Sequence, residues 1–388
     1  MTRRAARAAA ALAACVALAA ARPARAQSPP APDPWVYRVW LYPTYDGLEG
    51  FGGALSTGWR RAARPGPISS TAAIELDGAV TAAGTRTGQI VFDYPGLWPH
   101  WRFLALAGAD RLERAPYFGL GNEPVGDTAD AVRYFRYSLL RTTFLSSVER
   151  DLGHHLRAQV GTQVRHYHAQ PLGGDTTLLL RDLAAGAVDD TGRTTGVELR
   201  TGLLFDTRDE EFSPSRGVLV EALMGRGVGS LAYTRYRFEA DEFAPLGEMT
   251  VLGLRQSVEL ADRDIPFYVM YERLTDWRPE DGFGGPTTLR ATLPGRFLAP
   301  NRAIVSVDLR YKKIDFPLPT SPFRVWLVAF GDVGRLWMNG EQPDLTGLHW
   351  DGGVGGFLQI SKGSMFGLDV GVSGTDGFQF GSAFTFAF

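Results

Sequence analysis

Histidine pairs are the first residues to consider for chemistry, because imidazole is a common metal ligand in proteins. His166 and His168 are two residues apart, so on a β-strand both side chains point to one face. The apolar Val160 and Val164 share that face, which favours histidines at a membrane edge over a metal site. The sequence therefore predicts no metal centre and no cofactor.

A run of acidic residues lies between positions 206 and 211. The carboxylates of Asp206, Asp209, Glu210 and Glu211 have the chemistry to bind Ca²⁺, but a solvated turn is the simpler interpretation. No Ser–His–Asp order stands out, and no glycine-rich phosphate loop lies between a strand and a helix. The sequence gives no candidate catalytic residue and predicts a protein that is not an enzyme.

The C-terminal segment shows which elements the chain uses, because its residues alternate with the two-residue period of a β-strand. One face is aromatic and the other is small or polar, as in a strand between lipid and a polar barrel interior. A soluble β-sandwich would also bury one face. The aromatic face comprises Phe378, Phe380, Phe384, Phe386 and Phe388, and the opposite face comprises Gln379, Gly381, Ala383, Thr385 and Ala387.

Residues 1–26 have the features of a signal peptide, and this favours the barrel. Arginines at positions 3, 4 and 7 precede an alanine-rich apolar core over 8–21, and alanines at 24 and 26 provide a cleavage site. Cys15, the only cysteine, ends a lipobox-like stretch that begins at Leu12. Lipidation of Cys15 is therefore left as the alternative to its removal with the signal.

Composition excludes several classes of protein. The net charge of −2 gives no indication of nucleic-acid binding, so we expect no nucleic-acid partner. The mean hydropathy is −0.10, and no apolar run long enough for a helical span follows the signal. The 46 glycines suit the bends of a barrel, and the 12% aromatic residues suit its interfacial girdles.

After a proline-rich linker, 27–35, the region 36–388 reads as one outer-membrane β-barrel. Sixteen strand-like segments follow the linker, and an even number allows closure with both termini on the periplasmic side. The predicted fold is all-β: a sixteen-stranded antiparallel transmembrane β-barrel. The segments are approximately 36–46, 50–61, 69–83, 86–96, 99–114, 131–147, 153–169, 195–208, 216–227, 230–244, 248–262, 301–315, 322–338, 348–361, 364–373 and 377–388.

Several segments show which side faces the interior. In 303–312, Val305, Val307 and Leu309 alternate with Ser306, Asp308 and Arg310. A charge on the lipid face near the bilayer midplane costs about 2–4 kcal/mol, so the charged row should face inward. The segments 195–208, 230–244 and 248–262 alternate in the same way, whereas the register of 131–147 is not clear.

The longest gap between strands, 263–300, is the predicted sixth extracellular loop. A loop of this length in a compact barrel is either functional or disordered. Its glycines and prolines bend it in several places. Its apolar residues can pack, so we expect the loop to fold inward; they include Tyr268, Met270, Tyr271 and Leu274.

Four local patterns occur in order along the chain from about Gly119 onward. They are Tyr117-Phe118-Gly119-Leu120-Gly121-Asn122; Phe205-Asp206-Thr207-Arg208-Asp209 with Pro214-Ser215-Arg216-Gly217; Gly284-Gly285-Pro286-Thr287-Thr288-Leu289-Arg290 with Gly295-Arg296-Phe297; and Phe330-Gly331-Asp332-Val333-Gly334. Each pattern is weak alone. Together, with this C-terminus, they resemble the BamA/TamA superfamily of outer-membrane proteins, also called the bacterial surface antigen family.

The resemblance implies a site inside the barrel. In this family an arginine of the sixth loop folds into the lumen and contacts an aspartate of strand thirteen, which here implies Arg290 with Asp332. A buried guanidinium needs a carboxylate partner, and the planar fork of arginine suits a bidentate pair. Arg296 is the alternative loop arginine. The remaining residues of the implied motif are Leu289, Phe330, Gly331 and Gly334, of which Gly334 could leave space for the loop.

The chain departs from the family pattern in two places. Ala291 and Thr292 replace the glycine and aromatic residue that follow the loop arginine in the family. Alanine at a position that needs positive φ is strained, so we expect the loop tip to differ. The short stretch before residue 36 has no room for the periplasmic POTRA (polypeptide-transport-associated) domains of full-length members, so the resemblance implies a barrel-only member.

The resemblance also implies a function and partners. It implies an integral protein of the bacterial outer membrane in a Gram-negative host, which helps insert or export client proteins at a weak seam between the first and last strands. Its partners would be outer-membrane lipid and client β-barrel or exported proteins, and association into a homo-oligomer is left open. The alternatives are a passive or plugged channel with a charged lumen and a structural or surface-antigen barrel.

Overall fold

The computed structural model describes most of the chain after residue 33. The described residues are 34–46, 48–62, 70–123, 133–172, 177–188, 191–263, 265–276, 280, 282–318, 321–361 and 364–383. The predicted signal peptide and residues 27–33 of the predicted linker lie outside them. The compact unit that holds the strands begins at Trp35, one residue before the predicted start of the barrel.

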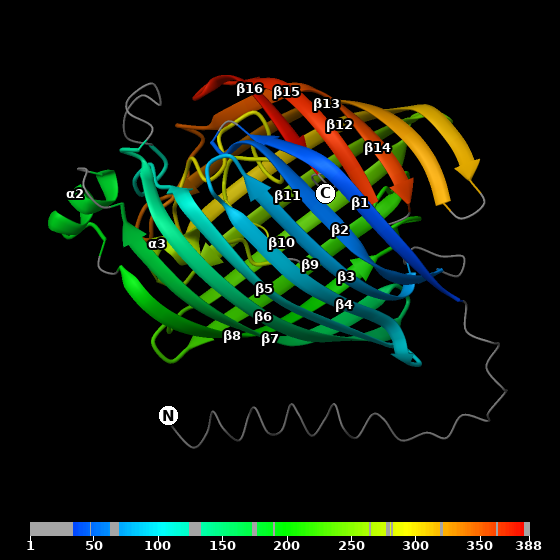
Figure 1. Ribbon diagram of the computed structural model, residues 1–388, viewed down its shortest axis with the longest axis horizontal. Helices are drawn as coiled ribbons and strands as arrows, with labels where there is room; N and C mark the ends of the chain where they lie inside the picture. The colour runs from blue at the N-terminus through cyan, green and yellow to red at the C-terminus, as the bar shows by residue number, and fades with distance from the viewer. Residues whose placement is uncertain are drawn as a thin grey trace. The chain divides into compact units, whose positions relative to one another are not determined.

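Sixteen strands form one antiparallel sheet in which each strand pairs with its neighbours in the chain (Figure 1). This confirms the predicted sixteen-stranded antiparallel barrel. The strands are β1 (Trp35–Asp46), β2 (Gly50–Ala62), β3 (Ser70–Thr81), β4 (Arg86–Trp98), β5 (Trp101–Pro116), β6 (Arg136–Gly153), β7 (Leu156–Pro171), β8 (Gly192–Asp206), β9 (Gly217–Val228), β10 (Thr234–Pro245), β11 (Thr250–Ala261), β12 (Asn301–Leu318), β13 (Ser321–Trp337), β14 (His349–Ser361), β15 (Ser364–Ser373) and β16 (Gly377–Ala383).

Two short helices lie in the connections, and the sequence predicted neither. They are α2 (Leu178–Ala184), between β7 and β8, and α3 (Phe267–Met270), between β11 and β12. The predicted sixth strand also began too early, because Phe135 packs in a loop against Phe118 with ring centroids 5.3 Å apart. Among the described residues, no helix is long and apolar enough to cross a membrane.

The side chains of β12 alternate between two environments. Val305, Val307 and Leu309 are about two-fifths exposed on the outer face, whereas Asp308 and Arg310 are each 1% exposed on the inner face. The same alternation runs along β10 and β11, whose arginines and glutamates are buried. The predicted inward orientation of these charged rows is confirmed, and the apolar outer face suits contact with lipid.

An arginine at position 309 should prevent assembly into a membrane. Leu309→Arg places a charge on the outer face of β12, at a cost of about 2–4 kcal/mol near the bilayer midplane. The measurement is the fraction of heat-modifiable, folded protein on a cold gel after folding into lipid vesicles. Leu345→Arg is the matched control, because Leu345 is 85% exposed in the connection between β13 and β14. Normal folding of Leu309→Arg would mean that Leu309 does not face lipid.

Aromatic residues fill one end of the barrel. The ring of Phe267 in α3 packs edge-on against Tyr117 and Tyr137, and Tyr268 packs against Tyr167, with ring centroids 4.9–5.3 Å apart. Figure 1 shows α2 and α3 at this same end. The cluster places the start of the β11–β12 connection against the inner wall of β6 and β7.

The turn between β8 and β9 lies at the other end and carries the acidic run. Glu211 Oε1 is 2.8 Å from Arg102 Nη1 on β5, and Glu210 Oε2 is 3.0 Å from Arg324 Nη1 on β13. These strands are eight places apart in the sixteen-strand order, so the turn contacts opposite walls. The predicted solvated turn is therefore wrong, because arginines hold these carboxylates. No group of three or more metal-ligating side chains occurs in the described part of the chain.

A side chain joins β1 to β16 at the seam of the sheet. The Tyr45 N–H donates to Ser382 Oγ at 2.9 Å, and the Ser382 hydroxyl donates to the Tyr45 carbonyl at 3.1 Å. The rings of Tyr45 and Phe380 lie 5.3 Å apart. Between the described residues of these two strands there is no ladder pairing of the kind that joins every other neighbouring pair.

Candidate functional site

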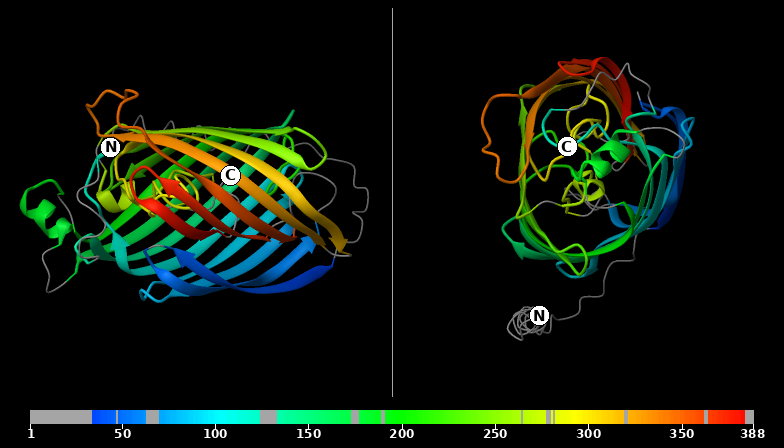
Figure 2. Two further views of the ribbon diagram at one scale, coloured as in Figure 1. Left: turned by 90° about the horizontal axis from the view of Figure 1, so that it is seen from above. Right: turned by 90° about the vertical axis from the view of Figure 1, so that its left-hand side faces the viewer.

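The connection between β11 and β12 folds into the lumen, as Figure 2 shows for the yellow segment inside the ring of strands. We call residues 263–300 the lumenal loop, 265–276 its root and 282–298 its tip. Leu289, Phe297 and Ala299 are at most 1% exposed, so the loop is packed against the barrel wall. Positions 264, 277–279 and 281 lie outside the described residues.

Arg290, at the tip, binds Asp332 of β13 through a bidentate pair. Its Nε donates to Oδ2 at 2.8 Å and its Nη2 donates to Oδ1 at 2.7 Å. The Arg290 backbone N–H also donates to Oδ2, at 3.2 Å. Its Nη1 donates to Asp308 Oδ1 of β12 at 2.6 Å. One guanidinium therefore ties the loop to two neighbouring strands, with the geometry in which arginine binds carboxylates most strongly.

The surroundings of Arg290 keep it charged. Its guanidinium carbon lies 4.2 Å from the centroid of the Phe330 ring, close enough for a cation–π contact. Burial alone would lower the pKa of Arg290, but the charges of Asp308 and Asp332 outweigh burial and hold the pKa above its usual value. The Arg290–Asp332 pair therefore does not titrate through Arg290 near neutral pH.

Of the other residues of the implied motif, Leu289 and Gly334 contribute to the packing of the loop, and Gly331 does not. Leu289 is fully buried beside Phe283 and Phe297. Gly334 leaves room for the loop, because a Cβ added there would lie 2.6 Å from Phe283 Cζ. Gly331 lies between two inward residues of β13, so it faces outward, and a Cβ added there would meet nothing closer than 3.9 Å. The structure gives Gly331 no part in this contact.

The residues after Arg290 bind Asp351 of β14. The Ala291 N–H and the Thr292 hydroxyl donate to Asp351 Oδ2 at 2.9 and 3.1 Å. Ala291 does not have positive φ, so the strain expected there is absent. Gly371 of β15 gives it room, because a Cβ added at Gly371 would lie 2.7 Å from the Ala291 Cβ.

Arg296 has its own partner and does not reach Asp332. Its Nε donates to Asp376 Oδ1 at 2.9 Å, in the connection between β15 and β16. Its guanidinium carbon lies 4.4 Å from the Phe118 ring centroid. Asp376 Oδ2 accepts the Leu293 N–H at 3.0 Å. Arg296 therefore adds a second ionic anchor for the tip instead of substituting for Arg290.

Glu272 anchors the root of the loop to β6 and β7. It is 1% exposed, and its Oε1 lies 3.2 Å from Arg141 Nη1. Its Oε2 forms an ion pair with Arg165 and accepts the Tyr167 hydroxyl at 3.1 Å. A carboxylate from the loop thus meets two arginines of the wall.

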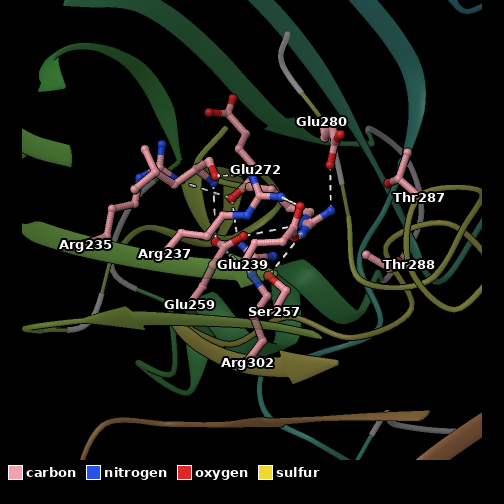
Figure 3. Close-up of polar contacts among 12 residues, drawn as sticks. Arg235, Arg237, Glu239, Ser257, Glu259, Glu272, Glu280, Thr287, Thr288 and Arg302 are labelled. Carbon is pink, nitrogen blue, oxygen red and sulfur yellow. Dashed lines mark hydrogen bonds and ion pairs between the residues drawn. The ribbon is translucent and has the colours of Figure 1, made fainter. Parts of the chain in front are cut away.

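The next residue, Arg273, is a loop arginine surrounded by carboxylates. Its guanidinium contacts Glu239 at 3.0 Å, Glu259 at 3.3 Å and Glu280 at 2.6 Å, three carboxylates that Figure 3 shows converging on one place in the lumen. Arginines of the wall also donate to backbone carbonyls of the root, which fixes its path. These bonds run from Arg302 to Met270 and Glu272, from Arg235 to Glu272, from Arg237 to Leu274, and from Arg200 to Thr275.

The two halves of the lumenal loop are therefore held by largely different strands, which overlap at β11 and β12. The root is bound by strands from β6 to β12, and the tip by β11 to β14 and by the β15–β16 connection. Sequence reasoning missed Glu272, Asp351 and Asp376 as anchors. The sequence shows only that these are charged residues at inward strand positions or in loops. It does not show which residues they bind.

A cavity of about 250 Å³ separates the tip from the strands at the seam. Its lining includes Thr44 of β1, Gln379 and Gly381 of β16, Asp369 of β15 and Arg290 of the tip. Apolar side chains, among them Leu293, Pro294 and Phe366, make up much of the remaining lining.

An apolar outer face, a charged lumen and an inward-folded loop define the class: a transmembrane β-barrel filled by one of its own connections. The model of the Omp85 superfamily domain matches residues 126–386, which is more than half of the chain. The chain belongs to the Omp85 superfamily, whose barrels are outer-membrane proteins. This confirms the resemblance found in the sequence.

Solved structures support the fold. The chain is similar to BamA from Haemophilus ducreyi lacking POTRA domains 1–3, with a TM-score of 0.58, 10% identity, and coverage of 90% of this chain and 70% of that chain. It is similar to CdiB from Acinetobacter baumannii with a TM-score of 0.53 and 10% identity, and it spans 59% of that protein's length. At this identity the likeness shows the fold alone. Comparison with curated proteins gives no match.

Proposed function

We propose that this protein helps client β-strands enter the outer membrane, either to insert client proteins there or to export them. Membership of the family supports the general role, and the seam between β1 and β16 suggests the mechanism. Open strand edges can pair with an incoming strand by β-augmentation. The partners in this proposal are outer-membrane lipid at the outer face and client proteins at the seam.

The observation that supports a strand-accepting seam is its bonding. The Ser382 side chain takes both the N–H and the carbonyl of Tyr45, which in a closed ladder would bond to backbone of the neighbouring strand. Among the described residues, the hydrogen bonds between these two strands go through this serine hydroxyl, which holds them less firmly than a ladder would, because each ladder bond adds to the pairing. An incoming strand would replace this contact with backbone hydrogen bonds.

The test is the folding rate of a small reporter barrel in proteoliposomes, with and without this protein. We expect the protein to accelerate folding. Vesicles that contain folded protein and show no acceleration would contradict the proposal. Steady ionic conductance in the same membranes would instead favour the channel alternative, which the buried lumenal loop argues against.

A disulfide across the seam should stop this activity. In Tyr45→Cys with Ser382→Cys the two cysteines replace residues that touch, so oxidation should join β1 to β16 and return reporter folding to the rate without protein. Reduction should restore the activity. The matched control is Val372→Cys with Phe378→Cys, which joins register partners of β15 and β16 and keeps the seam residues Tyr45, Phe380 and Ser382. Full activity of the oxidised Tyr45/Ser382 pair would show that the seam need not open.

A further inference from the structure

The outer face of the barrel has an open groove over β1, β2 and β3, which lie side by side in blue in Figure 1. The volume of the groove is about 730 Å³. Gly53 and Gly78 lie at its base, because both occupy outward positions and a Cβ added to either would meet nothing closer than 3.4 Å. Exposed apolar side chains complete much of the lining, so the groove suits a hydrocarbon chain; they are Leu41, Leu55 and Val80.

An arginine is also part of this lining. Arg86, the first residue of β4, is exposed, and its register partner on β5 is Arg111, whose side chain is exposed as well. Both point outward, because Asp110, next to Arg111, points inward to Arg141. Like charges directly opposite each other on neighbouring strands repel, so an anion bound by both arginines would relieve the repulsion.

The charge of this arginine pair is only partly compensated. The Nε of Arg111 lies 2.5 Å from Glu113 Oε1. The Arg86 side chain has no ion pair with any residue in the described part of the chain. Arg114, also exposed near the end of β5, adds a further positive charge. A planar guanidinium binds phosphate oxygens through two parallel hydrogen bonds, so the pair has the chemistry to hold a phosphate.

The height of Arg86 in the membrane places it among lipid headgroups. β4 has 13 residues and ends at Trp98, an exposed tryptophan of the kind found in interfacial girdles. At about 3.4 Å per residue and a tilt of about 40°, the strand spans about 30 Å, slightly more than the apolar band of about 25 Å. Arg86 therefore lies at the opposite interface from Trp98. The longer connections, including β5–β6, β7–β8 and β11–β12, lie at the Arg86 end, which is typical of the extracellular side.

We propose that the groove and the arginine pair form a binding site for a phosphorylated lipid of the outer leaflet. One acyl chain lies over Gly53 and Gly78, and a phosphate binds Arg86 and Arg111. An apolar groove beside two arginines fits a molecule that joins a hydrocarbon chain to a phosphate, and a free anion would leave the groove unused. This inference goes beyond the proposed function, because it does not require the seam to open.

The test is lipid retention by the full chain, purified in detergent and measured by native mass spectrometry. The probes are lipid A, a phosphorylated glycolipid, and the same lipid after removal of its phosphates. We expect lipid A to bind about tenfold more tightly, because arginine–phosphate hydrogen bonds are charge-assisted and basic residues near the membrane surface attract anionic lipid. Arg86→Gln with Arg111→Gln should remove this preference. The matched control, Arg181→Gln with Arg263→Gln, changes two exposed arginines at the same end of the barrel and should keep it.

A second variant separates the acyl chain from the phosphate. Gly53→Leu should fill the groove and weaken the binding of both lipids about equally, so the preference for phosphate should remain. Gly356→Leu is its control, because Gly356 is an exposed glycine of β14, outside the groove, with nothing within 4 Å of an added Cβ. Equal binding of the two lipids to the unmodified protein would overturn the inference. A preference that survives in the arginine variant, or unchanged binding to folded Gly53→Leu, would overturn it as well.

Discussion

Arg290→Ala should greatly reduce the amount of folded barrel, more than Asp332→Ala does. Removing the guanidinium leaves Asp332 and Asp308 buried without their shared cation, and breaking a buried ion pair costs about 3–5 kcal/mol. In Asp332→Ala the arginine keeps Asp308, so the loss should be smaller. The measurement is the midpoint of urea unfolding in lipid vesicles, read by heat-modifiability on cold gels.

The double variant tests the pairing itself. Arg290→Ala with Asp332→Ala should be no less stable than Arg290→Ala alone, because the two residues share one interaction. Arg181→Ala is the matched control, since Arg181 is an exposed arginine of α2 and its loss should leave the midpoint unchanged. Full additivity of the two single effects would contradict a direct functional pair.

Glu272→Ala should destabilise the protein, through the root of the lumenal loop, by about as much as Arg290→Ala does through the tip. It removes the carboxylate beside two buried arginines, Arg141 and Arg165, at a cost of about 3–5 kcal/mol. Glu272→Gln should cost less, because it keeps a hydrogen-bonding group. Unfolding midpoints measure both, and limited trypsin digestion should show new cleavage after Arg273 in the alanine variant.

Root and tip should also behave as independent anchors. Glu272 and Arg290 share no partner in the contacts described above, so the effects of Glu272→Ala and Arg290→Ala should add to within about 0.5 kcal/mol. Glu113→Ala is the control for the glutamate change, because Glu113 forms an exposed ion pair with Arg111 that contributes little. A strong departure from additivity would mean that the loop moves as one piece.

Most of the barrel could be predicted from the sequence because lipid imposes a two-residue period on each strand. Leu309 and Asp308 illustrate this. A charge is tolerated on the inner face only, so the pattern predicts both that a strand is present and which of its faces points inward. The pattern fails where residues pack in a loop. Phe135 looked like part of a strand, but it fills the aromatic cluster at the barrel end.

The candidate site was predictable only in part, for a different reason. Arg290 and Asp332 were named through family resemblance, and the structure brings them together. Asp376 and Glu272 were not named, because a loop charge can meet any inward charge that the closed barrel presents. The strain expected at Ala291 is missing because its φ is not positive, and Gly371, eighty positions away, leaves room for its Cβ. Such compensation between distant positions is invisible along a single sequence.

The turn between β8 and β9 determines how the barrel can deform. Glu210 and Glu211 are adjacent in the chain, yet they form ion pairs with Arg324 and Arg102 on opposite walls. The end of the barrel at the β8–β9 turn is therefore linked across its diameter. The opposite end is tied along nearly the same diameter, because the Asn122 side chain, in the connection after β5, accepts the Leu336 N–H of β13, and its carbonyl bonds the ring of His349 in β14. A barrel that yields to an incoming strand would therefore have to widen against ties at both mouths.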